Sequence, residues 1–398
     1  MAEPKLRFKR DDGSDYPILI EKKLGDIGTV LMCKRVFREQ TDTIGDVPFF
    51  KIGTFGGVPD AFIPQQLFEN LRMKYSFPKK GNILLSAAGT IGRVVRYNGE
   101  DAFFQDSNIV WLDHDTSVLD DYLYYFYQQV SWKNLEGGTI QRLYNSILLD
   151  KDISIPCLEE QQKIADFLSA VDEVITESEK EAANLEAQKK AVMKKIFSQE
   201  IRFTRSDGSP FPDWKEKQLE RLGKIIGGGT PKTSEKSYWN GSIPWISSAD
   251  LEENDIHSVN ISRYITEDAI RNSSTKIVPK NSLLIITRVG VGKVAISPCD
   301  LCTSQDYMSI SIEYDNSIFI GYAVSNLMQI RIKNVQGTSI KGIPSDEVKN
   351  YEIKIPCLEE QKLIADFLSD FDEAIAAAQK ELSLWKQLKK ALLQQLFV

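Results

Sequence analysis

The stretch Ile-Pro-Cys-Leu-Glu-Glu-Gln occupies residues 155–161 and occurs again, unchanged, at residues 355–361 of this 398-residue chain. The likeness continues through Ile-Ala-Asp-Phe-Leu-Ser, so that 16 of the 21 residues from 155 to 175 equal the residues 200 positions later. A period this long describes two domain-sized copies rather than a solenoid. The sequence therefore predicts a tandem duplication in which both copies share one fold.

The two copies differ most in one region. Residues 41–75 and 241–275 share little beyond a Pro followed by an aromatic residue. A fixed scaffold that carries two different surfaces suits a protein that recognises two unlike targets. A duplicated enzyme would more commonly keep one working site, or two alike.

The segments after the repeated stretch have a helical pattern, with no Pro or Gly until Gly208 in the first copy and none to the C-terminus in the second. Apolar residues at steps of three and four form a heptad seam with charged outer faces, which is typical of a coiled coil. We expect helices at residues 157–200 and 357–398 that pair antiparallel, the alternative being that each packs on its own domain. The seam residues are Ile164, Leu168, Val171, Ile175, Leu185 and Val192 in the first copy, and Ile364, Leu368, Phe371, Ile375, Leu382, Trp385 and Leu392 in the second.

The remaining segments, 1–156 and 201–356, contain short β-branched runs bounded by Gly, Pro or Asn, for example at 82–86, 108–112, 282–287 and 307–312. One helix is expected in each, at Leu119–Val130 and Ile318–Ile330. The predicted fold class is α+β, with two pseudo-symmetric domains of mixed α/β character, each followed by a long helix.

Composition limits the function classes. The net charge is −7, of which residues 159–200 (10 acidic, 6 basic) and 359–398 (7 acidic, 5 basic) contribute −4 and −2. The two large domains are therefore near neutral, which permits a local basic face but no strong electrostatic grip on nucleic acid. The chain lacks a run of about 18 apolar residues and begins with no signal peptide, so we expect a cytoplasmic protein that does not enter membranes.

Most catalytic motifs are absent. Gly223-Lys224 and Gly292-Lys293 are not followed by Ser or Thr, as a phosphate-binding loop requires, and no nuclease or base-methylation motif is found. The chain has only His114 and His257 for acid–base work. Cys299 and Cys302 form the only close cysteine pair, and reduced thiols suit them better than a metal site.

Gly-rich polar loops stand at equivalent places in both copies. Residues 89–93 match 289–293, residues 137–142 match 337–341, and the second copy adds a Gly-Gly-Gly-Thr-Pro loop at 227–231. Backbone amides and hydroxyls in such loops can hold phosphates, although Gly-rich turns between strands are also common without any ligand.

These features together resemble the specificity subunit of type I restriction-modification systems. The resemblance covers nearly the whole chain and rests on the repeated Ile-Pro-x-Leu-Glu-Glu-Gln, on residues 202–214, on Gly-Gly-Thr-Pro at 228–231 and on the aromatic run at 238–246. The first copy lacks the Gly-Gly-Thr-Pro loop, and Cys157 and Cys357 stand where the family often has Pro.

The resemblance implies that each large domain is a target recognition domain that reads one half of a split site in double-stranded DNA. It implies that the helices dock two methyltransferase subunits, with restriction and translocase subunits joining the complex, and that S-adenosylmethionine and ATP bind only to partners. The chain itself would be non-catalytic. A helix from 159 to 197 would span roughly 58 Å, more than one turn of duplex at about 34 Å.

Candidate DNA contacts come from the basic and polar loop residues. Those kept in both copies are expected to hold the DNA backbone, and those that differ are expected to read bases. The candidates are Lys80, Arg93, Lys133, Gln141, Arg142, Thr230, Lys232, Thr233, Ser234, Lys280, Arg288, Lys293, Lys333 and Lys341. A coiled-coil adaptor with no DNA role is the remaining alternative.

Overall fold

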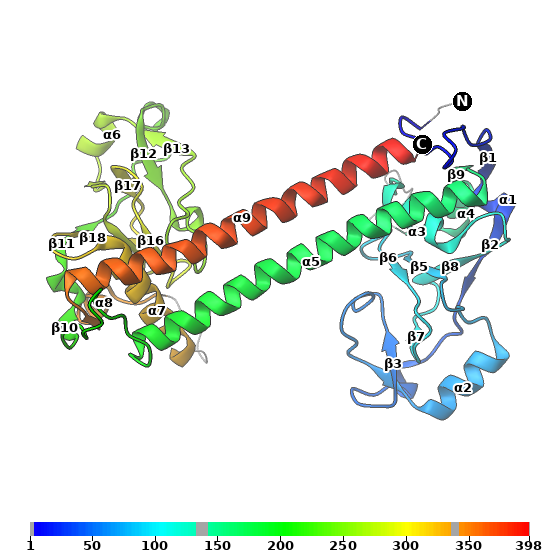
Figure 1. Cartoon of the computed structure of the whole chain (residues 1–398), viewed down its shortest axis with the longest axis horizontal. Coiled ribbons are helices and arrows are strands. Elements are labelled where there is room, and N and C mark those ends of the chain that lie inside the picture. The colour runs from blue at the N-terminus through cyan, green and yellow to red at the C-terminus, as the bar shows by residue number, and fades with distance from the viewer. Residues whose placement is uncertain (1–3, 133–141, 336–341, 398) are drawn as a thin grey trace. The chain divides into compact units, whose positions relative to one another are not determined.

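The computed structural model describes residues 4–132, 142–335 and 342–397. The chain forms two compact units, one of Met1–Glu179 with Lys380–Val398 (unit 1) and one of Lys180–Gln379 (unit 2). Each unit thus contains one globule, the start of the helix that follows it and the end of the other long helix. These helices are α5 (Leu158–Phe197) and α9 (Leu358–Leu396), shown in Figure 1 in green and in orange to red.

The globule of unit 1 has two main sheets. The first, which we call the proximal sheet, has the strand order β2-β8-β5-β6. The second, which we call the distal sheet, has the order β4-β3-β7. In chain order its elements are β1 (Ile20–Lys23), α1 (Leu24–Ile27), β2 (Gly28–Met32), η1 (Arg38–Gln40), β3 (Val47–Phe50), β4 (Phe62–Ile63), α2 (Gln65–Lys74), β5 (Ile83–Ser86), β6 (Val94–Arg96), β7 (Phe103–Phe104), β8 (Ile109–His114), α3 (Asp120–Gln129), α4 (Asn145–Leu149) and β9 (Asp152–Ile155).

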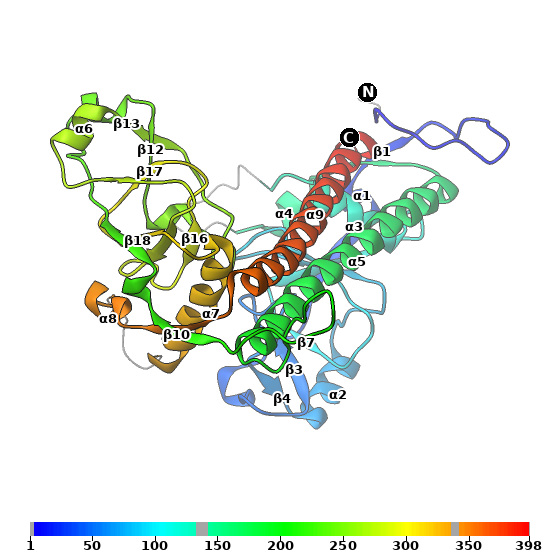
Figure 2. The same ribbon diagram turned by 60° about the vertical axis from the view of Figure 1, so that its left-hand side comes forward.

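Unit 2 repeats this plan with the proximal order β11-β18-β15-β16 and the distal order β13-β12-β17-β14. Figure 2 shows its distal sheet and α6 at the end of the globule away from α7 and α8. The elements are β10 (Lys215–Gln218), η2 (Leu219–Arg221), β11 (Gly223–Gly227), η3 (Lys236–Trp239), β12 (Ile243–Ile246), η4 (Ser248–Asp250), β13 (Arg263–Ile265), α6 (Glu267–Arg271), β14 (Ile277–Val278), β15 (Leu283–Ile286), β16 (Val294–Ile296), β17 (Leu301–Thr303), β18 (Tyr307–Ile312), α7 (Ser317–Val335), α8 (Ser345–Lys349) and β19 (Glu352–Ile355).

Each proximal sheet is buried on both faces. In β5, Ile83 and Leu85 pack on the α3 side, whereas Leu84 packs against the distal sheet. In β15, Leu283 and Ile285 face α7, whereas Leu284 faces the other way. Because successive strand residues point to opposite faces, both sets must be apolar, which explains why these strands show continuous hydrophobic runs instead of alternation.

The long helices complete the globular cores. In unit 1, Ile164 and Leu168 of α5 and Leu393 and Leu396 of α9 lie in the same core as α3. In unit 2, Ile364 and Leu368 of α9 share a core with Ile196 of α5. The seam residues near each globule therefore pack on that globule as well as along the helix pair, so both interpretations of the heptad pattern hold in different parts of the helices.

The helix segments within each unit run antiparallel. In unit 1, Lys389 pairs with Asp172 and Lys386 pairs with Glu179. In unit 2, Lys189 pairs with Asp372 and Gln379 donates to Glu186. Residue numbers rise on one helix as they fall on the other, which is the antiparallel arrangement expected from the duplication. The predicted α+β class with two long helices is thus confirmed.

Candidate nucleic-acid interface

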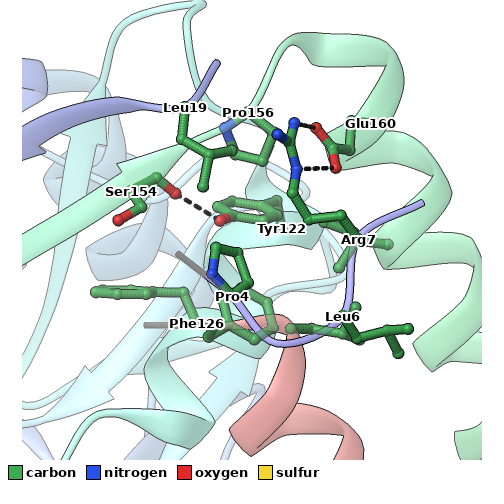
Figure 3. Close-up of a pocket in the computed structure, with 12 residues that line it drawn as sticks. Pro4, Leu6, Arg7, Leu19, Tyr122, Phe126, Ser154, Pro156 and Glu160 are labelled. Carbon is green, nitrogen blue, oxygen red and sulfur yellow. Dashed lines mark hydrogen bonds and ion pairs between the residues drawn. The ribbon is translucent and has the colours of Figure 1, made fainter. Parts of the chain in front are cut away.

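The repeated Leu-Glu-Glu-Gln sequence forms a joint between globule and helix. Its second glutamate, Glu160, is 1% exposed and accepts bonds from Arg7 at 3.1 and 2.6 Å (Figure 3). In unit 2, Arg202 makes the same fork with the fully buried Glu360, which also accepts a bond from Trp214 Nε1 at 3.2 Å. Paired buried charges of this kind fix geometry. The strongest repeat in the sequence is therefore structural.

The glutamine of the motif completes this joint. Gln161 accepts a bond from the Leu119 amide at the start of α3 and donates to the carbonyls of Ser117 and Pro156. Gln361 accepts from the Asn316 amide and donates to Asp315 and Pro356. Each glutamine satisfies an amide that the helix itself leaves free, so it holds α3 or α7 against the start of the following long helix.

The small hollow beside the first joint is too small for a ligand. It lies among the side chains of Figure 3, including Leu19, Tyr122 and Glu160. Its volume of about 10 Å³ accommodates roughly one water molecule. In unit 2 the residue equivalent to Leu19 is Trp214, whose ring packs on Phe197 and Phe319.

A second repeated joint was not predicted from the sequence. Tyr125 of α3 donates to Asp172 of α5 at 3.0 Å, and Lys389 of α9 pairs with the same carboxylate at 2.6 Å. Tyr322 of α7 donates to Asp372 at 2.5 Å, and Lys189 also pairs with Asp372. The pKa of both tyrosines is raised, mainly because the hydroxyl groups are buried and also because a negatively charged carboxylate lies beside each of them. Both aspartates and both lysines recur at the offset of 200, a signal that the sequence did contain.

The Gly-rich loops lie at the end of each proximal sheet away from the Glu160 and Glu360 joints. There β5 and β15 turn into the Gly-rich loops, in which Gly89, Gly92, Gly290 and Gly292 all have positive φ. The amide of Gly92 donates to Ser86 and that of Gly292 to Ile286, both at 3.0 Å, so the two turns have the same form. Side chains then distinguish them, since Ala88 in one globule corresponds to Arg288 in the other.

Two of the repeated basic residues are already engaged. Arg93 donates to the Phe55 carbonyl at 2.5 Å, and Lys293 donates to the Leu251 carbonyl at 2.8 Å. Both bonds tie the proximal sheet to the loop that follows the distal strands. A structural role can therefore account for their occurrence in both copies, and their predicted contact with DNA remains a prediction.

Lys80 and Lys280 stand elsewhere. Each is exposed at the turn before β5 or β15, with Gly81 or Asn281 in the left-handed region behind it. Within the described residues, neither ammonium group has an ion pair. The four residues of each strand, at about 3.4 Å per residue, separate these lysines from the Gly-rich loops at the other strand end. The structure thus does not bring Lys80 together with Arg93, or Lys280 with Lys293.

Several candidates lie near the loops or outside the described residues. Arg142 pairs with Ala88 in an isolated bridge and donates to the Ser107 carbonyl at 2.8 Å, and Arg288 is exposed beside Gly342. Lys133, Gln141 and Lys341 lie outside the described residues, as does the side chain of Lys333.

The Gly-Gly-Thr-Pro loop of unit 2 is held rigidly. Trp245 donates to the Gly229 carbonyl at 3.0 Å and Trp239 donates to the Lys232 carbonyl at 3.3 Å. The hydroxyl of Thr230 bonds to Gln305 at 2.5 Å. A Cβ on Gly229 would meet Ser274 Oγ at 2.3 Å, so only glycine fits. The loop therefore presents Lys232, Thr233 and Ser234 to solvent in a fixed position.

Metal chemistry and membrane insertion find no support in the described part of the chain. No group of three or more His, Cys, Asp or Glu residues there could hold a metal ion, and the five cysteines are free. None of the helices described has the length and apolar character needed to cross a bilayer.

The fold and the site together define a duplicated scaffold that presents two unlike loop surfaces. Residues 20–187 and 212–384 match the model of the type I restriction modification DNA specificity domain. The chain belongs to this family.

Relatives agree with that assignment. A putative type I restriction enzyme specificity subunit of Haemophilus influenzae, S.HindORF215P, is 58% identical over 147 residues, which cover 37% of this chain and 38% of the relative. The putative MjaX specificity subunit of Methanocaldococcus jannaschii is 28% identical over 334 residues, covering 79% of this chain and 76% of the relative. The chain spans less than half the length of the first two relatives matched, S.HindORF215P and the MjaIX specificity subunit of Methanocaldococcus jannaschii.

Solved structures share the fold. The S subunit of a type I restriction-modification system from M. genitalium aligns with a TM-score of 0.60 and 16% identity over 100% of this chain and 99% of that chain. A chain from a study of complex assembly and conformational transition of the type I system aligns with a TM-score of 0.58 and 16% identity, covering 96% of this chain and 97% of that chain.

Proposed function

We propose that this chain is the DNA-recognition subunit of a type I restriction-modification complex and reads an asymmetric, two-part DNA site. The observation that carries the proposal is the combination of identical joints with unlike loops. Arg7–Glu160 and Arg202–Glu360 hold both globules to the helices in the same way, whereas Ala88 corresponds to Arg288 and only unit 2 has the Gly-Gly-Thr-Pro loop. One scaffold with two readers suits two half-sites of different sequence.

In this proposal the loops read bases and the repeated exposed cations hold the backbone. The side chains of Lys232, Thr233 and Ser234 offer an ammonium donor and two hydroxyls, groups that can contact base edges or phosphates. Lys80 and Lys280, whose ammonium groups have no ion-pair partner among the described residues, can neutralise phosphates. The near-neutral globules would bind DNA weakly alone, so partner subunits must supply further positive charge.

The helices would dock two methyltransferase subunits, and restriction and translocase subunits would join through them. S-adenosylmethionine and ATP would bind to those partners, leaving this chain non-catalytic. The whole complex would act in the cytoplasm, where it meets DNA.

The test is to express the chain with its methyltransferase subunit in a host that lacks other modification genes and to sequence the methylome. We expect one motif made of two unlike half-sites with an unread gap, absent when this gene is deleted. Replacing residues 230–234 by a Gly-Ser loop should change one half-site and leave the other intact. A continuous motif, or methylation that does not require the chain, would overturn the proposal.

A coiled-coil adaptor without a DNA role is the competing function. A gel shift of the complex with labelled duplex, made with and without the chain, separates the two. An adaptor would leave the affinity for DNA unchanged.

A further inference from the structure

Unit 2 contains a cavity of about 480 Å³ that the proposed DNA contacts do not use. Its walls come from the unit-2 segments of α5 and α9, from α7 and from the loop 252–256. This volume lies within the range of about 300–1,000 Å³ that is typical of ligand sites. Small side chains, Ala183 and Ala187 on α5 and Ala376 on α9, leave the space open.

One wall is an insertion that the first globule lacks. The connection that follows Leu251 runs through residues 252–262 before β13, whereas the equivalent connection after Phe55 needs only residues 56–61 before β4. The inserted loop is anchored on the globule, because the Ile296 amide donates to the Ile256 carbonyl at 2.8 Å and Asn254 bonds to Gln329 of α7. The inserted loop is therefore an anchored part of unit 2 that has no counterpart in unit 1.

The cavity has a strong excess of negative charge. Lys189 and Asp372 neutralise each other at its base. Four further carboxylates line it, from Glu186, Glu252, Glu253 and Asp255, against the single ammonium of Lys190. Glu252 and Glu253 are exposed and have no ion pair within the described residues. Phosphate groups would be repelled here, so the site opposes DNA and favours a cation.

The polar groups in the walls fit a peptide chain. Asn326 and Gln329 of α7 and Gln379 of α9 line the cavity, and an amide side chain can both donate to a carbonyl and accept from an N–H group. The carboxylates of the inserted loop can pair with guanidinium or ammonium groups. Ile375 and Met193 add an apolar floor for the stems of long basic side chains.

We propose that this cavity receives a basic, Arg- or Lys-bearing segment of a methyltransferase subunit, so that the two subunits dock on unlike sites. The proposal rests on the proposed function, in which the helices bind two such subunits. Unit 2 would hold its partner through the helices and the inserted loop together. Unit 1, whose connection 56–61 contains Asp60 as its only acidic residue, would hold its partner without this contact.

The test compares charge-reversed chains in their binding to the purified methyltransferase subunit, by calorimetry without DNA. The full-length double variant E252K/E253K should lose at least about tenfold in affinity at the unit-2 site, because like charges across an interface are repulsive. The bound stoichiometry at moderate concentration should fall from two to one. The control E216K/E220K changes the same charge at two exposed acidic positions of unit 2 and should bind like wild type.

A second variant removes the space without changing charge. Ala187→Trp fills the cavity and should reduce the stoichiometry in the same way. If E252K/E253K and Ala187→Trp both bind two subunits with wild-type affinity, the cavity is not a docking site and this inference is wrong. If the wild-type chain itself binds no methyltransferase subunit, the proposed function fails instead.

Discussion

Neighbouring glutamates of one motif have opposite environments. Glu360 is fully buried against Arg202 and Trp214, whereas Glu359 is exposed and lies 3.8 Å from Arg205. A buried carboxylate that loses its charge leaves the paired guanidinium uncompensated, which costs several kcal/mol, whereas exposed pairs contribute about 0–1 kcal/mol.

We therefore expect Glu360→Gln to lower the free energy of unfolding by about 2–4 kcal/mol, and the adjacent Glu359→Gln to change it by no more than about 0.5 kcal/mol. Urea unfolding of both full-length variants measures the difference. Equal stability of the two variants would show that the buried fork does not support the fold.

His114 gives unit 1 a pH dependence. Its Nε2 lies 3.2 Å from Asp120, and the hydrogen bond to this carboxylate raises the pKa of the imidazole above its ordinary value. A group whose pKa is higher in the folded state stabilises the protein at low pH and loses that contribution as pH rises through the folded-state pKa. The His114 contribution is thus complete below the ordinary histidine pKa of about 6.5.

Wild-type protein should accordingly lose stability as the pH rises above about 6.5, by a small amount that His114→Gln lacks. Thermal unfolding at a series of pH values measures this slope. A His114→Gln protein with an unchanged slope would contradict the assignment.

The hydrogen bonds of the repeated basic residues lead us to expect two different roles for them. Lys280→Ala should weaken binding to all DNA sites alike and lower the salt slope of the assembled complex by about one, as expected for one phosphate contact. Lys293→Ala should leave that slope unchanged and instead destabilise unit 2 by about 1 kcal/mol, because it removes the bond to the Leu251 carbonyl. Fluorescence anisotropy at several salt concentrations measures the salt slope of each variant. If Lys280→Ala instead changed which bases are preferred, Lys280 would not be a phosphate contact.

At the scale of elements, the helices and many strands could be predicted from the sequence. The expected helix Leu119–Val130 is α3 at Asp120–Gln129, and the run 307–312 is β18. These elements follow from local periodicity. The antiparallel helix pairing followed from duplication, which supplies symmetry that a single copy would not.

The joints and the site could not be predicted in the same way. Arg7 and Glu160 are distant in sequence, and nothing local indicates that they meet. The Arg93 and Lys293 side chains look like surface cations in the sequence, yet each bonds to a backbone carbonyl of a neighbouring loop. Which loop residues would read bases depends on contacts with DNA, and the folding of the chain alone does not determine those contacts.

The seam of the helix pair can be tested with adjacent residues. Leu185 is half-buried on α5, and Asn184 beside it is exposed. Leu185→Asp should destabilise the helix pairing of unit 2 by about 2 kcal/mol or more, because it places a charge in a desolvated position, and assembly with the methyltransferase should fail. Asn184→Asp introduces the same charge at the exposed neighbour and should assemble normally. Size-exclusion chromatography of the co-expressed complexes reports both outcomes.

At the scale of the whole molecule, the helices are proposed to set the spacing of the two half-sites. Asp172 and Lys189 of α5 are 17 residues apart, and so are Asp372 and Lys389 of α9. Lengthening only one helix would break this match. Four residues inserted after Ala183 and four after Ser383 keep both joints and add roughly 6 Å of helix.

With about 3.4 Å of duplex per base pair, this double insertion should widen the unread gap by one or two base pairs while the half-sites stay the same. A coiled coil tolerates a four-residue insertion by slight unwinding. Methylome sequencing of the variant gives the motif directly. An unchanged gap with full activity would mean that the helices do not act as a ruler.

The near-identity of the two joints has a consequence for how the chain folds. During synthesis, the N-terminal segment with Arg7 meets Glu160 first, but Glu360 later offers the same partner, and repeated domains are prone to such misassembly. The two joints differ in side-chain volume, because in unit 2 the ring of Trp214 packs on Phe197 and Phe319, whereas unit 1 has the smaller Leu19 at the equivalent position. An indole arriving at the first joint would not fit, because the hollow beside Leu19 has a volume of only about 10 Å³. A single change of side-chain volume thus makes incorrect pairings less stable than correct ones, and folding fidelity depends on the residues by which the copies have diverged.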